Sequence, residues 1–274
     1  MGIVDTHLHL IALDRFRYPW LDGLPALNRS FDLADYRAEA APLDIEAMLH
    51  MEVDVAEADI AAETAWATGL GHGVVGAIAA CRPESPAFPA WLEEAAANPR
   101  VRGFRRILHT EPDTLSQAPL FAENLRRLAG VGRPFDLCVL ARQLELGRAL
   151  VRACPDVQFV LDHCGVPDVT SRVLDPWRAD IEALARLPNI ACKISGIVAY
   201  AAPEWRVDDL RPFVEHVVAC FGWERVVWGS DWPVCTLTAD LTRWVEATRV
   251  LVAGASDDER RNLYSANARR LYGL

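Results

Sequence analysis

The sequence lacks the features that would place the chain outside the ordinary globular proteins. No apolar run approaches the roughly 20 residues of a membrane span, and no basic and then apolar segment marks a signal at the N-terminus. Positive charge is scarce, since 28 Lys and Arg against 38 Asp and Glu give a formal net charge of −10. Phosphate binding needs a basic stripe, so this balance argues against a nucleic-acid partner. It also fits poorly with an anionic membrane surface, and we expect neither partner.

The cysteines lack the pattern of a disulfide framework. Their number, seven, is odd, and no two of them form a Cys-x-x-Cys pair. Five lie within or just after apolar runs, as small buried hydrophobic residues do: Cys81, Cys138, Cys164, Cys192 and Cys235. We therefore expect free thiols and a reducing, cytoplasmic location.

What the sequence does have is a regular alternation of short apolar runs and amphipathic segments. The predicted strands are 3–8, 47–53, 74–79, 101–105, 135–139, 157–161, 190–194 and 225–228. The predicted helices are 120–129, 143–153, 176–187, 208–221 and 241–252, with a last helix that opens on the capping box Ser256-x-x-Glu259 and runs to Leu271. Strands that are apolar on both faces and alternate with helices indicate βαβ units. Eight such units predict an α/β fold, a closed (βα)8 TIM barrel that uses residues 1–274 as one domain.

One segment departs from this alternation. Residues 11–43 carry Tyr18-Pro19-Trp20 and Leu24-Pro25, which predict a long loop after the first strand. Because long loops inside compact domains are usually functional, we expect this one to form a wall or lid of a pocket.

Polar side chains follow several of the predicted strands. His7 and His9 lie two residues apart, so they project from the same face of the first strand. His163 and Asp231 each end another apolar run, and parallel strands of a barrel share one functional rim. A His-x-His pair alone is equally consistent with a surface or core pair. Two imidazoles that meet a carboxylate and a third imidazole indicate a divalent-metal or oxyanion site and hydrolytic chemistry.

Taken in order, the motifs of the chain resemble those of the amidohydrolase superfamily, in its branch of lactonases. The motifs are Asp5-Thr6-His7-Leu8-His9, Tyr18-Pro19-Trp20, Val101-Arg102-Gly103-Phe104-Arg105, Leu161-Asp162-His163-Cys164-Gly165, Cys192-Lys193-Ile194-Ser195-Gly196, Gly229-Ser230-Asp231-Trp232-Pro233 and Asn267-Ala268-Arg269-Arg270-Leu271-Tyr272. The first and the Gly-Ser-Asp-Trp-Pro motif are specific on their own, and the series spans nearly the whole chain.

The resemblance implies roles for these residues. It makes Asp231 the general base that activates water, while His163 and the pair His7 and His9 polarise a lactone carbonyl, with or without a metal. Strand four offers Arg105, and strand five has no His, so a binuclear centre is not expected. One divalent ion of the zinc or manganese type, held by His7, His9 and Asp231 with Glu52, is expected, and whether it is required stays open.

Candidate substrate contacts each have a second interpretation. Arg105 could meet a substrate oxygen or pair with a carboxylate in the barrel. Lys193 could touch substrate or pair with Asp162 or Glu52. His109 could reach the mouth of the barrel or lie in the core or in solvent. Tyr18, Trp20 and Trp232 are aromatic side chains that could form an apolar face for a sugar ring.

The resemblance implies hydrolysis of an aldono-1,4- or 1,5-lactone of a sugar acid. Three alternatives stay open: hydrolysis of a dicarboxylate such as 2-pyrone-4,6-dicarboxylate, metal-dependent decarboxylation of an aromatic acid, and a barrel that only binds a small molecule. The Tyr-Pro-Trp and Gly-Ser-Asp-Trp-Pro motifs argue against the decarboxylase. The sequence names no particular sugar, and a homo-oligomer is compatible with it.

Overall fold

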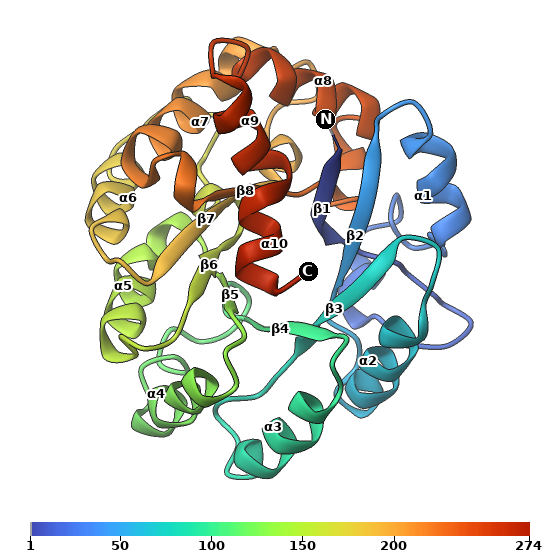
Figure 1. The fold of residues 1–274 in the computed structure, drawn as a ribbon, viewed down its shortest axis with the longest axis vertical. Helices are drawn as coiled ribbons and strands as arrows, with labels where there is room; N and C mark the ends of the chain where they lie inside the picture. Colours follow the sequence, from blue (N-terminus) through green and yellow to red (C-terminus); the bar gives the residue numbers. More distant parts are fainter. Residues whose placement is uncertain (1) are drawn as a thin grey trace.

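Short apolar runs form the eight strands of a parallel barrel in the computed structural model, which describes residues 2–274 (Figure 1). The strands are β1 (Ile3–Leu8), β2 (Ile45–Met51), β3 (Val74–Ala80), β4 (Val101–Ile107), β5 (Phe135–Cys138), β6 (Phe159–Leu161), β7 (Ile190–Ile194) and β8 (Val226–Trp228). Each pairs in parallel with the next along the chain. Nearly all of their residues are buried, because helices cover the outer face and side chains fill the inside.

The ring closes just beyond the end of β8. A parallel bridge joins Leu8 to Trp232, and the Asp231 backbone N–H donates to the carbonyl of His7 at 2.8 Å. The Thr6 hydroxyl also donates to the carbonyl of Trp228 at 2.7 Å. These bonds fix the segment after β8 beside the first strand. The predicted (βα)8 barrel is therefore confirmed.

Helices cover this barrel, most of them in an outer ring around the strands (Figure 1). They are α1 (Leu33–Ala40), α2 (Ile60–Gly69), α3 (Phe88–Ala97), α4 (Pro119–Arg126), α5 (Leu144–Ala153), α6 (Trp177–Ala185), α7 (Val207–Phe221), α8 (Leu241–Leu251), α9 (Asp257–Arg261) and α10 (Asn267–Tyr272). The five internal helices predicted from periodicity are present, whereas α1, α2 and α3 were not predicted. The predicted last helix begins at the Ser256–Glu259 capping box, and a π-helical turn over Asn262–Ala266 joins α9 to α10.

The long segment after β1 is confirmed as an excursion from the barrel, although it is not wholly irregular. It contains a 3₁₀ turn over Pro19–Gly23 and then α1. The Trp20 indole N–H donates to the carbonyl of Val53 at 2.9 Å, which ties the excursion to the loop after β2.

The core has two parts. The larger lies between the strands and the helices, and a smaller one fills the inside of the barrel. Residues Ala268, Leu271 and Tyr272 of the C-terminal helix belong to the smaller part, and Figure 1 shows that helix lying across one end of the barrel.

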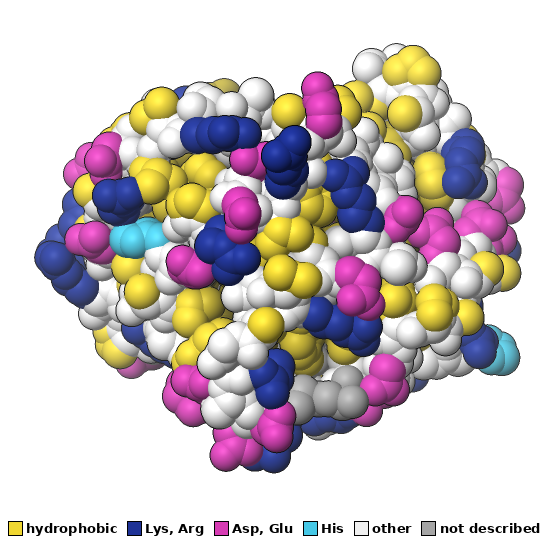
Figure 2. All heavy atoms as spheres, turned by 90° about the horizontal axis from the view of Figure 1, so that it is seen from above, with side chains coloured by type: hydrophobic (Ala, Val, Ile, Leu, Met, Phe, Trp, Pro, Cys, Tyr) yellow, Lys and Arg dark blue, Asp and Glu magenta, His cyan; other side chains and the backbone are white. Residues whose placement is uncertain are grey.

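The surface carries both signs of charge. On the face drawn in Figure 2, acidic and basic side chains alternate without gathering into a basic stripe. Within residues 2–274, no helix combines the length and the apolar character needed to cross a membrane.

Candidate active site

The carboxyl ends of three strands bring four polar side chains together. The Nε2 atoms of His7 and His9, both from β1 and its end, are 3.1 Å apart. The Asp231 Oδ1 atom, beyond β8, lies 3.6 Å from His7 Nε2 and 3.4 Å from His9 Nε2. His163, beyond β6, places its Nε2 atom 4.0 Å from the same oxygen. The structure thus brings the four residues to one place at the rim of the barrel.

Two of these residues have unusual backbones. His163 and Asp231 have φ values of 53° and 56°, and Cys164 follows with 54°. Left-handed backbone is unfavourable for residues with a Cβ, and such strain concentrates at functional sites. Here the left-handed backbone turns the chain sharply after β6 and β8, and the side chains of His163 and Asp231 lie beside His7 and His9.

Bonds to buried neighbours hold the Asp231 turn in position. The Asp5 carboxylate accepts from the backbone N–H groups of His7 at 3.0 Å and Ser230 at 2.8 Å. The Tyr36 hydroxyl of α1 donates to its other oxygen at 2.6 Å. Asp5, the first residue of the Asp-Thr-His-Leu-His motif, therefore links β1, the segment after β8 and the excursion.

Burial controls the charge of the cluster. It lowers the pKa of His163, lowers the pKa of His9 to about 3 and, together with the Lys193 ammonium, holds the pKa of His7 well below its usual value. All three imidazoles are therefore neutral near pH 7. Burial raises the pKa of Asp231 to about 6, with His163 and Arg105 acting in the opposite direction, so this carboxyl is still mostly ionised near pH 7.

The donor atoms of His7, His9 and Asp231 fit a single divalent cation. A tetrahedral zinc site with bonds of about 2.0–2.2 Å has ligand atoms about 3.3–3.6 Å apart. The three separations here, 3.1, 3.4 and 3.6 Å, lie at or near that range. His9 Nδ1 faces the carbonyl of Met51 at 3.1 Å, which turns its Nε2 lone pair toward the other two atoms. A second group with suitable spacing, His7, Asp162 and His163, adjoins the first.

Glu52, expected as a further ligand, is not in either group. Its Oε1 accepts from Arg105 Nε at 2.5 Å, and its Oε2 accepts from the Asp54 backbone N–H at 2.9 Å. The Arg105 guanidinium therefore draws this carboxylate away from the histidines. Arg105 also reaches His7 Nε2 with Nη1 at 3.3 Å, so it both pairs with a carboxylate and faces the site.

A cavity of about 380 Å³ opens over the cluster. Its walls include His9, His163, Asp231 and Arg105. Trp20 and Leu24 from the excursion line it as well, so the excursion forms a wall, as expected. The loop residue His109 also lines it, which settles its placement at the mouth.

Three other predicted contacts do not line this cavity. Tyr18 is buried, and its hydroxyl accepts from the Ala12 backbone N–H at 3.0 Å. Trp232 is wholly buried against Phe31 and Tyr36. Lys193 points into the barrel, where its Nζ lies 2.5 Å from Asp136 Oδ2 and 3.0 Å from Asp162 Oδ1. Pairing with Asp162 was the second interpretation for this lysine.

The sequence did not reveal every wall of the cavity. Tyr200, in the turn after β7, lines it with its ring centre 6.5 Å from that of His163. Leu237 and Val234, in the turn after Asp231, form an apolar side. No local pattern marks these residues, because each lies in a loop whose path depends on tertiary contacts.

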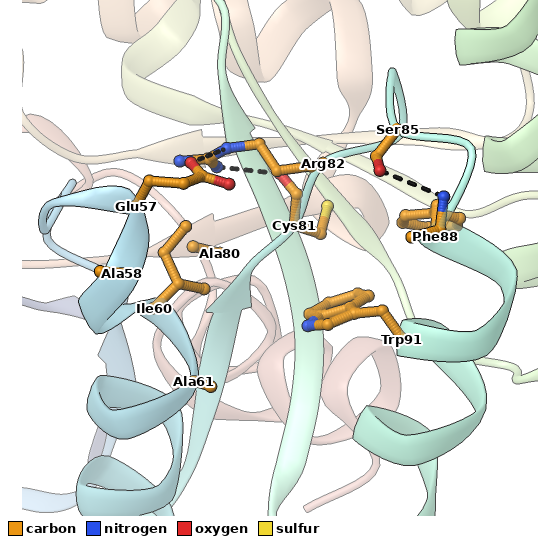
Figure 3. A pocket seen from close by; sticks show the side chains of 11 residues that line it. Glu57, Ala58, Ile60, Ala61, Ala80, Cys81, Arg82, Ser85, Phe88 and Trp91 are labelled. Carbon is orange, nitrogen blue, oxygen red and sulfur yellow. Dashed lines mark hydrogen bonds and ion pairs between the residues drawn. The ribbon is translucent and has the colours of Figure 1, made fainter.

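A second cavity, of about 230 Å³, lies between α2 and α3 (Figure 3). Its apolar wall includes Ile60, Phe88 and Trp91, and the Glu57 carboxylate accepts from Arg82 Nε at 2.9 Å at its edge. Burial raises the pKa of the Cys81 thiol there well above its usual value. The residues lining it hold no cluster of metal ligands and no base beside this thiol, so reactive groups concentrate in the first cavity.

Comparison with known proteins agrees with this geometry. A family model described as amidohydrolase matches residues 4–274. An L-fucono-1,5-lactonase of Burkholderia multivorans is 29% identical over 300 residues, which cover 99% of this chain and 96% of the relative. A crystal structure of an amidohydrolase with bound zinc, from the same species, is 26% identical with a TM-score of 0.90 over 100% of both chains.

A third protein is similar in fold. The crystal structure of a protein from Pseudomonas putida, described as a putative 2-pyrone-4,6-dicarboxylic acid hydrolase, has a TM-score of 0.79 and 24% identity, and the match covers 99% of this chain and 97% of that one.

Proposed function

The chain belongs to the amidohydrolase family, and from that premise we propose that it is a hydrolase that opens the ring of a sugar-acid lactone. The family agrees with the one predicted from the motifs. The observation that carries the proposal is the meeting of Asp231 with three neutral histidines at the rim of the barrel, where Asp231, His9 and His163 line one cavity. The similarity to an L-fucono-1,5-lactonase over nearly the full length of both chains supports the substrate class.

Asp231 is the proposed general base. Its carboxylate is ionised near pH 7 and faces the cavity, so it accepts a proton from water as the water oxygen attacks the lactone carbonyl carbon. The tetrahedral intermediate then breaks the ring C–O bond, and the proton on Asp231 passes to the departing alkoxide. The product is a single hydroxy acid, which carries both the released hydroxyl group and the new carboxylic acid group. A positioned base of this kind contributes about 10²–10⁴-fold to a rate.

His163 and Arg105 stabilise the negative oxygen of the intermediate. The His163 Nδ1 atom lies 2.9 Å from the Ser195 hydroxyl, and this contact orients the ring so that Nε2 faces the cavity. Arg105 keeps its positive charge because Glu52 pairs with it, and it also lines the cavity. Hydrogen-bond donors that are held in place before the reaction stabilise developing charge most effectively.

We also propose that His7, His9 and Asp231 hold one divalent ion of the zinc or manganese type. Their donor atoms have the spacing of a single-ion site, and a structurally similar amidohydrolase binds zinc. When bound, such an ion polarises a carbonyl and lowers the pKa of water. We leave Glu52 out of this proposed site, because its carboxylate pairs with Arg105.

The charges of the cavity favour a neutral lactone over a dicarboxylate. Arg105 is the one Lys or Arg side chain among the described residues that line it, and Glu52 already neutralises that charge. Asp54 and Asp231 line the same walls and would repel two further carboxylates. Recognition of a dicarboxylate usually relies on several arginine donors.

A hydrolysis screen tests the proposed function. Aldono-1,4- and 1,5-lactones and 2-pyrone-4,6-dicarboxylate are offered to the purified protein, and acid release is followed with a pH indicator. We expect turnover of aldono-lactones and a loss of about 10²–10⁴-fold in kcat for Asp231→Asn. Asp258→Asn, an exposed change on α9, is the matched control and should keep full activity. Turnover of the dicarboxylate alone, or of no lactone, would overturn the proposed substrate class.

A further inference from the structure

Beneath the cavity, a buried lysine touches the back of the histidine pair. Lys193 is wholly buried on β7, and its Nζ atom lies 3.2 Å from His7 Nδ1. The same nitrogen lies 3.0 Å from Asp162 Oδ1, and Asp162 Oδ1 is itself 3.4 Å from His7 Nδ1. A donor and an acceptor therefore compete for one nitrogen of His7.

One assignment of protons makes a continuous hydrogen-bonded chain. A carbonyl only accepts, so His9 carries its proton on Nδ1, facing Met51, and its Nε2 is bare. An ammonium only donates, so a bond from Lys193 leaves His7 Nδ1 bare and puts the proton on Nε2. That proton then points at His9 Nε2, 3.1 Å away. Each group thus donates to the next: Lys193 to His7, His7 to His9, and His9 to the Met51 carbonyl.

The other assignment makes a cation site. If His7 Nδ1 carries the proton, it donates to Asp162, and His7 Nε2 becomes bare. Two bare imidazole nitrogens then face each other at 3.1 Å, with the Asp231 oxygen 3.4 and 3.6 Å away. Three acceptors that converge in this way need a cation between them, although Arg105 Nη1 also reaches His7 Nε2 at 3.3 Å.

We propose that Lys193 and Asp162 hold His7 in either of two tautomers, and so let one set of residues serve as a hydrogen-bonded pair without metal or as a divalent-cation site. The lysine stabilises the metal-free tautomer and the aspartate stabilises the metal-binding one. The ring keeps one proton throughout, lost from Nε2 and regained on Nδ1, so the exchange needs no net acid or base. Both are positioning residues, because neither lines the cavity. The inference rests on the proposed function for the identity of the site.

The histidine tautomers can be observed directly. Protein labelled with ¹⁵N-histidine is freed of metal with a chelator and then titrated with zinc, and long-range ¹H–¹⁵N spectra report which nitrogen of each ring is protonated. We expect two strongly shifted rings: one with its proton on Nδ1 in both states, which is His9, and one whose proton moves from Nε2 to Nδ1, which is His7. A His7 ring protonated on Nδ1 before zinc is added would overturn the proposal. A spectrum in which zinc moves no histidine signal would overturn it as well.

Two substitutions should change zinc affinity in opposite directions. Asp162→Ala removes the acceptor for Nδ1–H, and we expect zinc to bind about 10–100-fold more weakly, as for other losses of such partners. Lys193→Met removes the competing donor, and zinc should bind more tightly, with His7 protonated on Nδ1 already in the metal-free protein. Asp258→Asn, the exposed change on α9, is the control, because this side chain contacts none of Lys193, Asp162 and His7. If Asp162 and Lys193 only supported the fold, both substitutions would weaken zinc binding.

These readouts are independent of lactone turnover. Tautomer exchange without hydrolysis of any lactone would leave the present proposal standing and remove the proposed function. Hydrolysis of a lactone by a protein whose His7 tautomer does not change with zinc would support the proposed function and overturn the present proposal.

Discussion

At Gly196 the backbone passes so close to two reactive side chains that a larger residue has no room. A Cβ atom there would lie 2.2 Å from His163 Nδ1 and 2.8 Å from Asp231 Oδ2, and the residue has a φ of +62°. The glycine therefore allows the loop after β7 to pass close to both Asp231, the proposed base, and His163. Its role is local and steric, and it is distinct from any hydrogen bond in the site.

Gly196→Ala should damage both stability and activity. Left-handed backbone alone costs about 1–2 kcal/mol for alanine, and the contact with His163 adds to this. We expect the midpoint of urea unfolding to fall and kcat on the lactone substrate to drop more than KM changes, because His163 and Asp231 must move. Gly254→Ala is the matched control, since nothing lies within 4 Å of its added Cβ. Equal behaviour of the two variants would contradict this account.

The four central residues were predictable because strand ends determine where they lie. His7 and His9 share a face by the period of a strand, and His163 and Asp231 end apolar runs that form β6 and β8. Tyr18 and Trp20 were not distinguishable in the same way. They are two residues apart in an irregular segment, and tertiary contacts bury Tyr18 while Trp20 faces the cavity.

A buried carboxylate ties α2 to the loop after β2. Glu63 of α2 accepts from the backbone N–H of Val53 at 2.9 Å, and the same oxygen lies 3.6 Å from His50 Nε2. The side chain is almost wholly buried, and burial raises its pKa. This contact holds the chain that leads from β2 to Asp54 on the cavity wall.

A raised pKa predicts the sign of a pH dependence. The folded protein binds the Glu63 proton more tightly than the unfolded chain does, so this group favours folding at low pH. Its contribution is lost as the pH rises from the unfolded to the folded pKa. Glu63→Gln should therefore gain stability relative to the natural protein at pH 8, with a smaller difference near pH 5. Thermal unfolding at both values checks this, with the exposed Glu93→Gln as a control that should show no such trend. A variant that loses stability at pH 8 would contradict it.

Elements were predictable where periodicity is strong and were missed where it is weak. The strands follow from apolar runs, although 47–53 was placed two residues late, since β2 is Ile45–Met51. Helix α5 is amphipathic, with a charged face opposite an apolar one. In contrast, α2 and α3 are rich in alanine and lack a clear polar face. Helix α1 is short, and its sequence shows no apolar face, because Tyr36 is its one buried residue. Its packing against Trp232 is a tertiary fact that no local pattern carries.

The last helix, α10, closes one end of the barrel. That helix lies across the barrel (Figure 1), and its residues Ala268, Leu271 and Tyr272 belong to the cluster inside the strands. The Tyr272 hydroxyl donates to the Asp136 carboxylate at 3.0 Å. Asp136 pairs with Lys193, so one series of contacts runs from the last helix to His7 beneath the cavity.

Two substitutions separate the polar and apolar parts of this closure. Tyr272→Phe removes a hydrogen bond to a charged group and should lower the free energy of unfolding by about 1.5–3 kcal/mol. Tyr272→Ala also empties the space of a buried ring, and losses of this kind are about 3–5 kcal/mol. Urea unfolding of both variants gives the two values. If the helix were only loosely attached, both losses would be near zero, because the strands would then hold their interior without it. The free energy of unfolding should therefore be lowest for Tyr272→Ala, intermediate for Tyr272→Phe and highest for the natural protein. This order is expected only if α10 is part of the barrel core.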